Sequence, residues 1–158
     1  MLKHEVNGFF ESLKSEGKLI AVTHIYEQLN ARPGLDIYYL RPKLEELFKA
    51  GLVTNSSAYI DLLSIPKLFE DLPEWSANNL HLILEACLEL SKEDVLLKVM
   101  KKCLEKLSTV KIVDMLKKVM ILDRNHLALS ILDIALSNNN HGKSSLIITR
   151  LSGYFHTS

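Results

Sequence analysis

Hydrophobic residues recur three or four positions apart along most of the chain, which is the spacing of one face of an α-helix. In the first third of the chain this pattern predicts a helix over residues 2 to about 15 and a second over residues 22 to about 30. A third apolar stripe ends at Gly51 and contains Pro42, which fits without loss of a hydrogen bond only into the first turn of a helix. We therefore place the start of the third helix near Tyr39.

Residues 51–63 interrupt the helical spacing. Two short apolar runs, Leu52-Val53 and Tyr59-Ile60, lie on either side of residues that favour turns. Two extended runs joined by a turn are typical of paired strands, so this pattern predicts a small β-hairpin.

The order of these elements resembles a known fold. Three helices followed by a hairpin over residues 5 to 63, with the segment LRPKLEELFKAGLV at the end of the third helix, resemble a winged-helix domain. The resemblance implies an N-terminal winged-helix-like domain at residues 1–63, whose third helix would be the one that reads DNA. On that helix, Arg41 and Lys43 are the candidate DNA contacts.

The remaining residues, 64–158, are predicted to form a second, helical domain. A short helix with Pro66 in its first turn is followed, from Ser76 onward, by five apolar stripes separated by short polar breaks. The N-cap residues expected to begin the second, third and fourth of these helices are Ser91, Ser108 or Thr109, and Asp123. Because the breaks are short, neighbouring helices must turn back on each other. We expect an antiparallel bundle or a short superhelical stack of about five helices.

The chain carries 19 basic and 19 acidic side chains, so its net charge gives no general attraction to nucleic acid or to an acidic membrane. The charges are nevertheless unevenly placed. Residues 59–91 hold one basic and six acidic residues, whereas residues 92–124 hold nine basic and five acidic residues. Adjacent segments of opposite sign indicate helices that complement each other at their exposed edges, or two separate surfaces.

The basic segment is the origin of one alternative function. Its lysines could follow the phosphates of RNA, with Lys98, Lys101 and Lys102 as the candidate contacts. However, residues 92–124 contain no aromatic residue and only one arginine. Proteins that bind RNA usually add aromatic stacking surfaces and guanidinium groups. Nucleic-acid binding is therefore an alternative that the sequence does not favour.

The last part of the chain is unusually poor in charge. Residues 125–158 contain three charged side chains, and the segment 127–136 is apolar nearly all round. Such a helix lies either at the centre of a bundle or against a partner protein. Three aromatic residues from earlier in the chain are further candidates to anchor a partner, since tryptophan and tyrosine concentrate binding energy at protein contacts. The candidate core or interface residues are Leu127, Ile131, Leu132, Ile134, Ile147, Leu151, Trp75, Tyr59 and Phe69.

The sequence lacks signatures of catalysis, cofactor binding and metal binding. Its six histidines form no zinc-binding pattern, the segment Gly142-Lys143-Ser144 lacks the earlier glycine of a phosphate-binding loop, and no nucleophile elbow is present. Cys87 and Cys103 fall on apolar helix faces, which predicts buried, reduced thiols. Since no signal peptide or membrane-spanning run is present, we expect a cytoplasmic protein.

Together these patterns favour a mainly α-helical, non-enzymatic protein–protein interaction module, such as an adaptor, an assembly factor or a regulatory subunit. We expect it to bind a protein partner or a second copy of itself, without a cofactor, metal ion, small-molecule substrate or membrane. Two alternatives stay open: a winged-helix DNA-binding transcriptional regulator with a helical dimerisation domain, and a helical-repeat RNA-binding protein.

Overall fold

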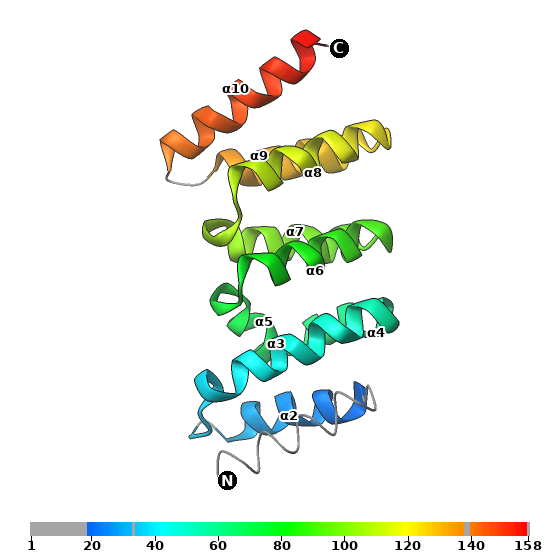
Figure 1. Ribbon diagram of the computed structural model, residues 1–158, viewed down its shortest axis with the longest axis vertical. Helices are drawn as coiled ribbons and strands as arrows, with labels where there is room; N and C mark the ends of the chain where they lie inside the picture. The colour runs from blue at the N-terminus through cyan, green and yellow to red at the C-terminus, as the bar shows by residue number, and fades with distance from the viewer. Residues whose placement is uncertain (1–18, 33, 138–139, 158) are drawn as a thin grey trace.

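The computed structural model describes residues 19–32, 34–137 and 140–157. All regular structure in these ranges is helical, which confirms the predicted mainly α-helical fold (Figure 1). The predicted helix over residues 2 to 15 lies outside the described residues. In chain order the elements, with η for a short 3₁₀-helix, are α2 (Leu19–Ala31), α3 (Ile37–Thr54), α4 (Ser56–Asp61), η1 (Leu62–Ser64), α5 (Pro66–Asp71), η2 (Leu72–Glu74), α6 (Ala77–Glu89), α7 (Glu93–Cys103), η3 (Leu104–Lys106), α8 (Thr109–Ile121), α9 (Asn125–Leu136) and α10 (His141–Thr157).

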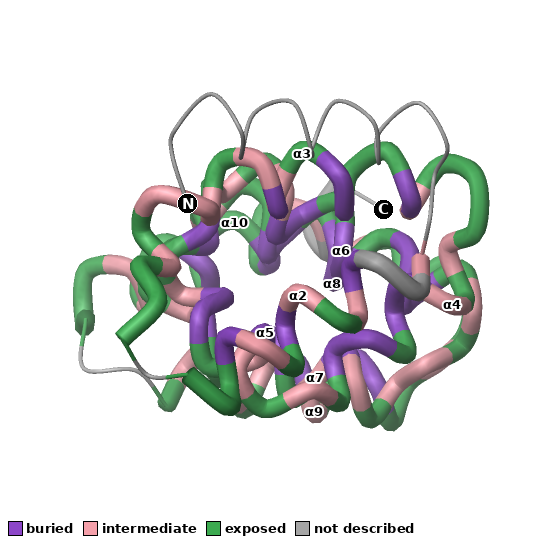
Figure 2. Tube along the Cα trace, turned by 90° about the horizontal axis from the view of Figure 1, so that it is seen from below, coloured by how far each residue is buried: buried purple, intermediate pink, exposed green. Residues whose placement is uncertain are grey.

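The helices are stacked along one long axis, with α2 near one end and α10 at the other (Figure 1). α6 and α7 pack together as a hairpin, and α8 and α9 form a second hairpin next to the first. Seen along the stack, α3, α6, α8 and α10 lie toward one side and α5, α7 and α9 toward the other, with buried positions between the two rows (Figure 2). Of the two arrangements expected after Ser76, the structure therefore has the stack of helix pairs.

A structural repeat underlies the stack. Ser76, Ser108 and Asn140 are 32 positions apart, and the side chain of each begins a helix by accepting a hydrogen bond from the backbone N–H three residues later. The donor–acceptor distances are 3.4, 3.2 and 3.0 Å. Each cap gives a partner to one N–H group that the first turn of a helix leaves without one. Residues at the same place in successive units are thus 32 positions apart.

The turns within the hairpins follow the same interval. Ser91 and Asp123 have positive φ values of 56° and 59°, the left-handed conformation that ends many helices. The next N–H group in each turn donates to a carbonyl oxygen five residues earlier, at 2.8 Å for Lys92 and 3.1 Å for Arg124. The predicted N-cap at Ser108 is confirmed, whereas those at Ser91 and Asp123 are wrong, because these two residues end the preceding helix.

The left-handed turn at Ser91 gives a prediction. A serine with a φ of 56° is strained, whereas glycine reaches this region without steric cost. We expect Ser91→Gly to raise the free energy of unfolding by about 0.5–1 kcal/mol, measured by urea unfolding. The control is Ser76→Gly, which removes an N-cap at a φ of −66° and should lower stability slightly. Unchanged or reduced stability of Ser91→Gly would contradict this role of the turn.

The predicted β-hairpin at residues 51–63 is wrong, and the winged-helix unit is not confirmed. No strand occurs in the described part of the chain, where residues 51–54 complete α3 and residues 56–64 form α4 and η1. Tyr59 and Leu63 lie four positions apart and are both buried, which is the spacing of a helix face. Apolar runs as short as these do not by themselves distinguish a strand from a helix.

α3 begins earlier than the sequence predicted. The Asp36 carboxylate accepts a hydrogen bond from the backbone N–H of Tyr38 at 3.0 Å, and this cap starts the helix at Ile37 instead of near Tyr39. Pro42 consequently lies inside the helix and not in its first turn. The helix therefore continues through Pro42 with one backbone hydrogen bond fewer.

Gly51 lies inside α3 as well, since the helix continues to Thr54. The ring of Tyr59 from α4 lies directly against this glycine, and a Cβ atom at position 51 would overlap the ring. Gly51 is thus required by the close approach of α3 and α4, and not by a turn at the end of a helix.

A buried polar contact joins the beginning of the stack to the hairpins. The buried Asp71 carboxylate accepts hydrogen bonds from the Arg41 guanidinium at 2.6 to 3.1 Å and from the Trp75 indole N–H at 3.0 Å. Trp75 is fully buried and packs edge to face against Phe48, with 5.3 Å between ring centroids. Because α2 packs on α5 and α3 on α6, one core runs across the predicted domain boundary. The division into domains 1–63 and 64–158 stays a prediction.

Candidate functional site

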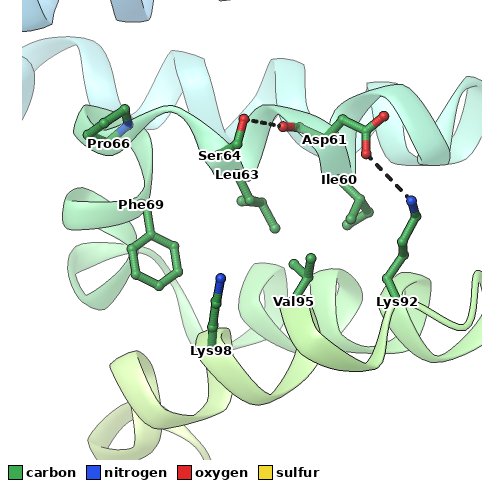
Figure 3. Close-up of a pocket in the computed structure, with 9 residues that line it drawn as sticks. All are labelled: Ile60, Asp61, Leu63, Ser64, Pro66, Phe69, Lys92, Val95 and Lys98. Atoms are coloured by element: carbon green, nitrogen blue, oxygen red, sulfur yellow. Dashed lines mark hydrogen bonds and ion pairs between the residues drawn. The ribbon is translucent and has the colours of Figure 1, made fainter.

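An open groove of about 560 Å³ lies between the α4–α5 segment and α7. Ile60 and Leu63 point from one wall toward Val95 on α7, and Phe69 borders the groove at one end (Figure 3). Together these four side chains form the apolar inner surface of the groove, which we call its floor. The full set of lining residues is Ile60, Asp61, Leu63, Ser64, Pro66, Phe69, Lys92, Val95 and Lys98.

The rim of the groove is positively charged. The Lys92 ammonium lies 3.8 Å from the Asp61 carboxylate, and the two side chains are 43% and 66% exposed. Lys98 extends into the groove beside Phe69 (Figure 3), and within the described residues it has no hydrogen bond or ion pair. The ammonium group of Lys102 lies over the Phe69 ring, 5.8 Å from its centroid. Two lysines and one carboxylate therefore line the groove, and Lys102 adds a third cation beside the Phe69 ring.

Most of the candidate interface residues belong to the core. α9 packs between α7 and α8, which explains why so few of its residues are polar. Leu132 and Ile134 are partly buried on α9, and Phe69 is the one aromatic candidate at the groove. The candidates that the structure buries against the rest of the chain are Leu127, Ile131, Ile147, Leu151, Trp75 and Tyr59.

The candidate nucleic-acid contacts are not gathered on one surface. The guanidinium of Arg41 is held by Asp71, whose hydrogen bond raises the pKa of the arginine, and Lys43 is half-buried on the same helix. Lys106 donates a hydrogen bond to the carbonyl oxygen of Trp75 at 3.2 Å. α7 and α8, which carry most of the basic segment, stand in different rows of the stack (Figure 2). The exposed candidates, all on α7, are Lys98, Lys101 and Lys102.

A second pocket of about 120 Å³ lies between α6 and α8. His81 is buried there, and its Nε2 atom has no hydrogen-bond partner among the residues described. Burial lowers the pKa of His81 and Lys111 lowers it further, while Glu85 acts in the opposite direction. The residue at the same place in the next repeat is Val113, so an apolar side chain fits this position.

The burial of His81 predicts a pH-dependent stability. Its pKa is lower in the folded protein than its ordinary value of about 6.5, so the unfolded chain takes up a proton more readily. The free energy of unfolding is therefore expected to fall as the pH falls below about 6.5. We expect His81→Val to flatten this dependence in urea unfolding between about pH 7.5 and pH 5. Equal slopes for the two proteins would show that His81 is not the source of the pH dependence.

Both thiols of the chain are shielded from solvent. Cys87 and Cys103 are buried and unpaired, as predicted, and burial raises their pKa values to about 12 and about 11. A thiol with such a pKa is a poor nucleophile at neutral pH. In the ranges that the structure describes, no three His, Cys, Asp or Glu side chains are placed to hold a metal ion. No described helix is both long and apolar enough to cross a membrane.

No family model, curated protein or solved structure matches the chain. Sequence reasoning missed the groove as a unit, because its walls come from residues 60–69 and 92–98, which are distant in the chain. The sequence showed an aromatic residue, Phe69, in the acidic segment and a lysine, Lys98, in the basic segment. Only the fold shows that both line the same groove.

Proposed function

We propose that this protein is a non-enzymatic protein–protein interaction module, which binds an acidic, partly apolar segment of a partner protein in the groove between α4–α5 and α7. The observation that carries the proposal is Lys98, a cation that extends over an apolar floor without a partner among the described residues. A contact that covered this floor would also exclude water from the lysine. The occupant must therefore supply a negative charge.

The groove defines the chemistry of its partner in two ways. Val95 and Phe69, which are only partly buried, offer apolar contact for an aliphatic or aromatic side chain, whereas Ile60 and Leu63 are already buried beneath them in the core. A carboxylate beside the partner's apolar side chain would pair with Lys98, and a second carboxylate would reach Lys102 at the Phe69 end. A basic segment would be repelled by the same lysines, so the site selects by charge. An adaptor, an assembly factor or a regulatory subunit would use such a site.

The test uses the full chain and a short fluorescein-labelled peptide in which glutamates alternate with leucines. Its binding is measured by fluorescence anisotropy at two salt concentrations. We expect saturable binding that weakens with salt, and we expect Lys98→Glu to weaken it by about tenfold, equivalent to about 1.4 kcal/mol. A peptide with lysine in place of each glutamate should not bind. The matched control is Lys49→Glu, which reverses an exposed lysine on α3 and should bind as the unsubstituted protein does.

Two results would overturn the proposal. One is equal binding of the acidic and the basic peptide, because this would show that charge does not select the occupant. The other is the same affinity for Lys98→Glu and the unsubstituted protein, because binding would then occur away from the groove.

Nucleic-acid binding is the competing proposal, and it is favoured by the exposure of Lys98, Lys101 and Lys102 on a single helix. A labelled single-stranded RNA in the same assay distinguishes the two. RNA binding that is lost in Lys101→Glu with Lys102→Glu would support the helical-repeat RNA-binding protein instead. The DNA-binding regulator is tested in the same assay with labelled duplex DNA. Binding that is lost in the double variant Arg41→Ala with Lys43→Ala would support it. DNA binding by Arg41 would require its guanidinium group to leave the Asp71 carboxylate.

A further inference from the structure

The groove lies in a row of helices that is closed one unit further along the stack. α5, α7 and α9 form this row (Figure 2), and α7 packs directly on α9. Residues 61–71 precede residues 93–103 by 32 positions, so both ranges are the same part of successive units. The later range is one continuous helix, whereas the earlier one is divided, because Ile65 is extended and Pro66 begins the separate helix α5. The groove lies at this division, since Ser64 and Pro66 both line it.

Val95 shows the effect of this division on the floor of the groove. Val95 on α7 corresponds to Leu127 on α9, 32 positions later. Leu127 is only 3% exposed, in a helix that packs on both α7 and α8, whereas Val95 is partly buried and borders the groove. An apolar side chain thus occupies the same place in both units. Packed helices cover it in the later unit and leave it partly open at the groove.

The contact points that α7 offers have the spacing of a helix face. Val95, Lys98 and Lys102 are three and four positions apart, so along the axis of α7 they are separated by about 4.5 Å and about 6 Å. Val95 and Lys98 line the groove, and the Lys102 ammonium lies over the ring of Phe69 at its end. Neither lysine has an ion pair among the described residues. The groove therefore offers one apolar contact followed by two cations.

An occupant that lies along α7 matches these points as a helix. Side chains three and four residues apart on an α-helix are separated by the same distances of about 4.5 Å and about 6 Å. An extended chain places the side chains of one face about 6.7 Å apart, so three contacts would span about 13 Å instead of about 10.5 Å. The walls of the groove are helices, whose backbone groups already bond within each helix. The N–H and C=O groups of an extended occupant would therefore lack backbone partners there, whereas a helix bonds its own.

From these observations we infer that the partner segment binds as an α-helix along α7, with an apolar residue against Val95 and two acidic residues, four positions apart, against Lys98 and Lys102. The inference rests on the proposed function, because it specifies the conformation and the side-chain spacing of the acidic segment that the groove binds. The apolar residue lies three positions from one acidic residue and seven from the other. This spacing distinguishes the inference from the binding of an extended acidic segment.

Short fluorescein-labelled peptides test the inference on the full chain by fluorescence anisotropy. The glutamate–leucine peptide contains both spacings, so these peptides carry one leucine and two glutamates, with alanine and glutamine elsewhere. In the helical type the glutamates lie three and seven positions from the leucine, in either sequence order, and in the extended type they lie two and four positions from it. We expect the better helical-type peptide to bind about tenfold more tightly than the extended type. A proline between its two glutamates should abolish this advantage.

Charge reversal then identifies which residues pair. Lys98→Glu and Lys102→Glu should each weaken binding of the better helical-type peptide about tenfold, whereas the control Lys49→Glu should not. Changing one glutamate of the peptide to lysine should restore binding to Lys98→Glu, and changing the other should restore binding to Lys102→Glu. Equal or tighter binding of the extended type, or restoration of both variants by the same peptide position, would overturn the inference and leave the proposed function standing. Failure of every peptide, the glutamate–leucine peptide included, would overturn the proposed function as well.

Discussion

Replacing Asp71 with alanine is expected to lower the free energy of unfolding by about 3–5 kcal/mol, the largest effect of any substitution that we predict. The Asp71 carboxylate is the common partner of the Arg41 guanidinium and the Trp75 indole N–H. Without it, a buried positive charge and a buried N–H group would lose their partners together. Urea unfolding followed by far-UV circular dichroism measures the loss.

Two further variants separate this effect from that of an ordinary ion pair. Asp61→Ala removes the exposed carboxylate that lies 3.8 Å from Lys92, and we expect it to cost less than about 1 kcal/mol. Adding Arg41→Leu to Asp71→Ala removes the unpaired charge, and should recover a large part of the stability. A loss below about 1 kcal/mol for Asp71→Ala would show that this contact does not hold the two parts of the stack together.

Gly51→Val is expected to have the second largest effect, a loss of about 3 kcal/mol in the free energy of unfolding. Even the first carbon of a side chain at position 51 would overlap the ring of Tyr59, so this buried ring, or the two helices, would have to move. The matched control is Gly153→Val in α10, where a Cβ atom would meet no other atom within 4 Å. That control should stay within about 0.5 kcal/mol of the unsubstituted protein.

A double-mutant cycle tests the cause of the Gly51→Val effect. Tyr59→Ala alone leaves a cavity and should be destabilising. In the double variant the valine can occupy space that the tyrosine ring has vacated, so the combined loss should be smaller than the sum by roughly 2 kcal/mol. Additive losses would contradict the steric explanation.

The sequence predicted those parts of the fold in which one helix face is clearly apolar. The five stripes after Ser76 correspond to α6 through α10, and the cap at Ser108 was identified from residue type alone. Ser91 and Asp123 were misassigned because the same short polar residues that cap helix starts also occur in left-handed turns at helix ends. Residue type does not distinguish these roles; the backbone conformation does.

The errors in the first half have a different cause, since contacts between distant residues decide the structure there. α4 is only six residues long, so its apolar residues could not reveal a helical period. Pro42 lies inside α3 because the Asp36 cap begins the helix earlier. Similarly, no local pattern connects Phe69 with Lys98, which come together only when α5 packs near α7. Local patterns therefore predicted the elements better than the site they form.

The repeat also explains why the apolar character of α9 and α10 could be interpreted in two ways from the sequence. Ile131 and Ile147 are fully buried and serve the core, whereas Leu129 and Ile148, on other faces of the same helices, are exposed. Composition cannot separate these faces, but comparison of positions 32 residues apart can. We expect the two faces to respond differently to substitution, since Ile131→Ala would leave a cavity in the core and lower stability, whereas Leu129→Ala would have little effect.

The groove between α4–α5 and α7 is proposed to bind an acidic segment of a partner protein. Chemical-shift mapping on the isotope-labelled full chain, titrated with the glutamate–leucine peptide, tests it most directly. We expect the amide signals that move to be concentrated in residues 60–69 and 92–98, and few of them to move in Lys98→Glu. Signals that stay unchanged at saturating peptide, or that move instead around Leu129 and Ile148, would contradict it.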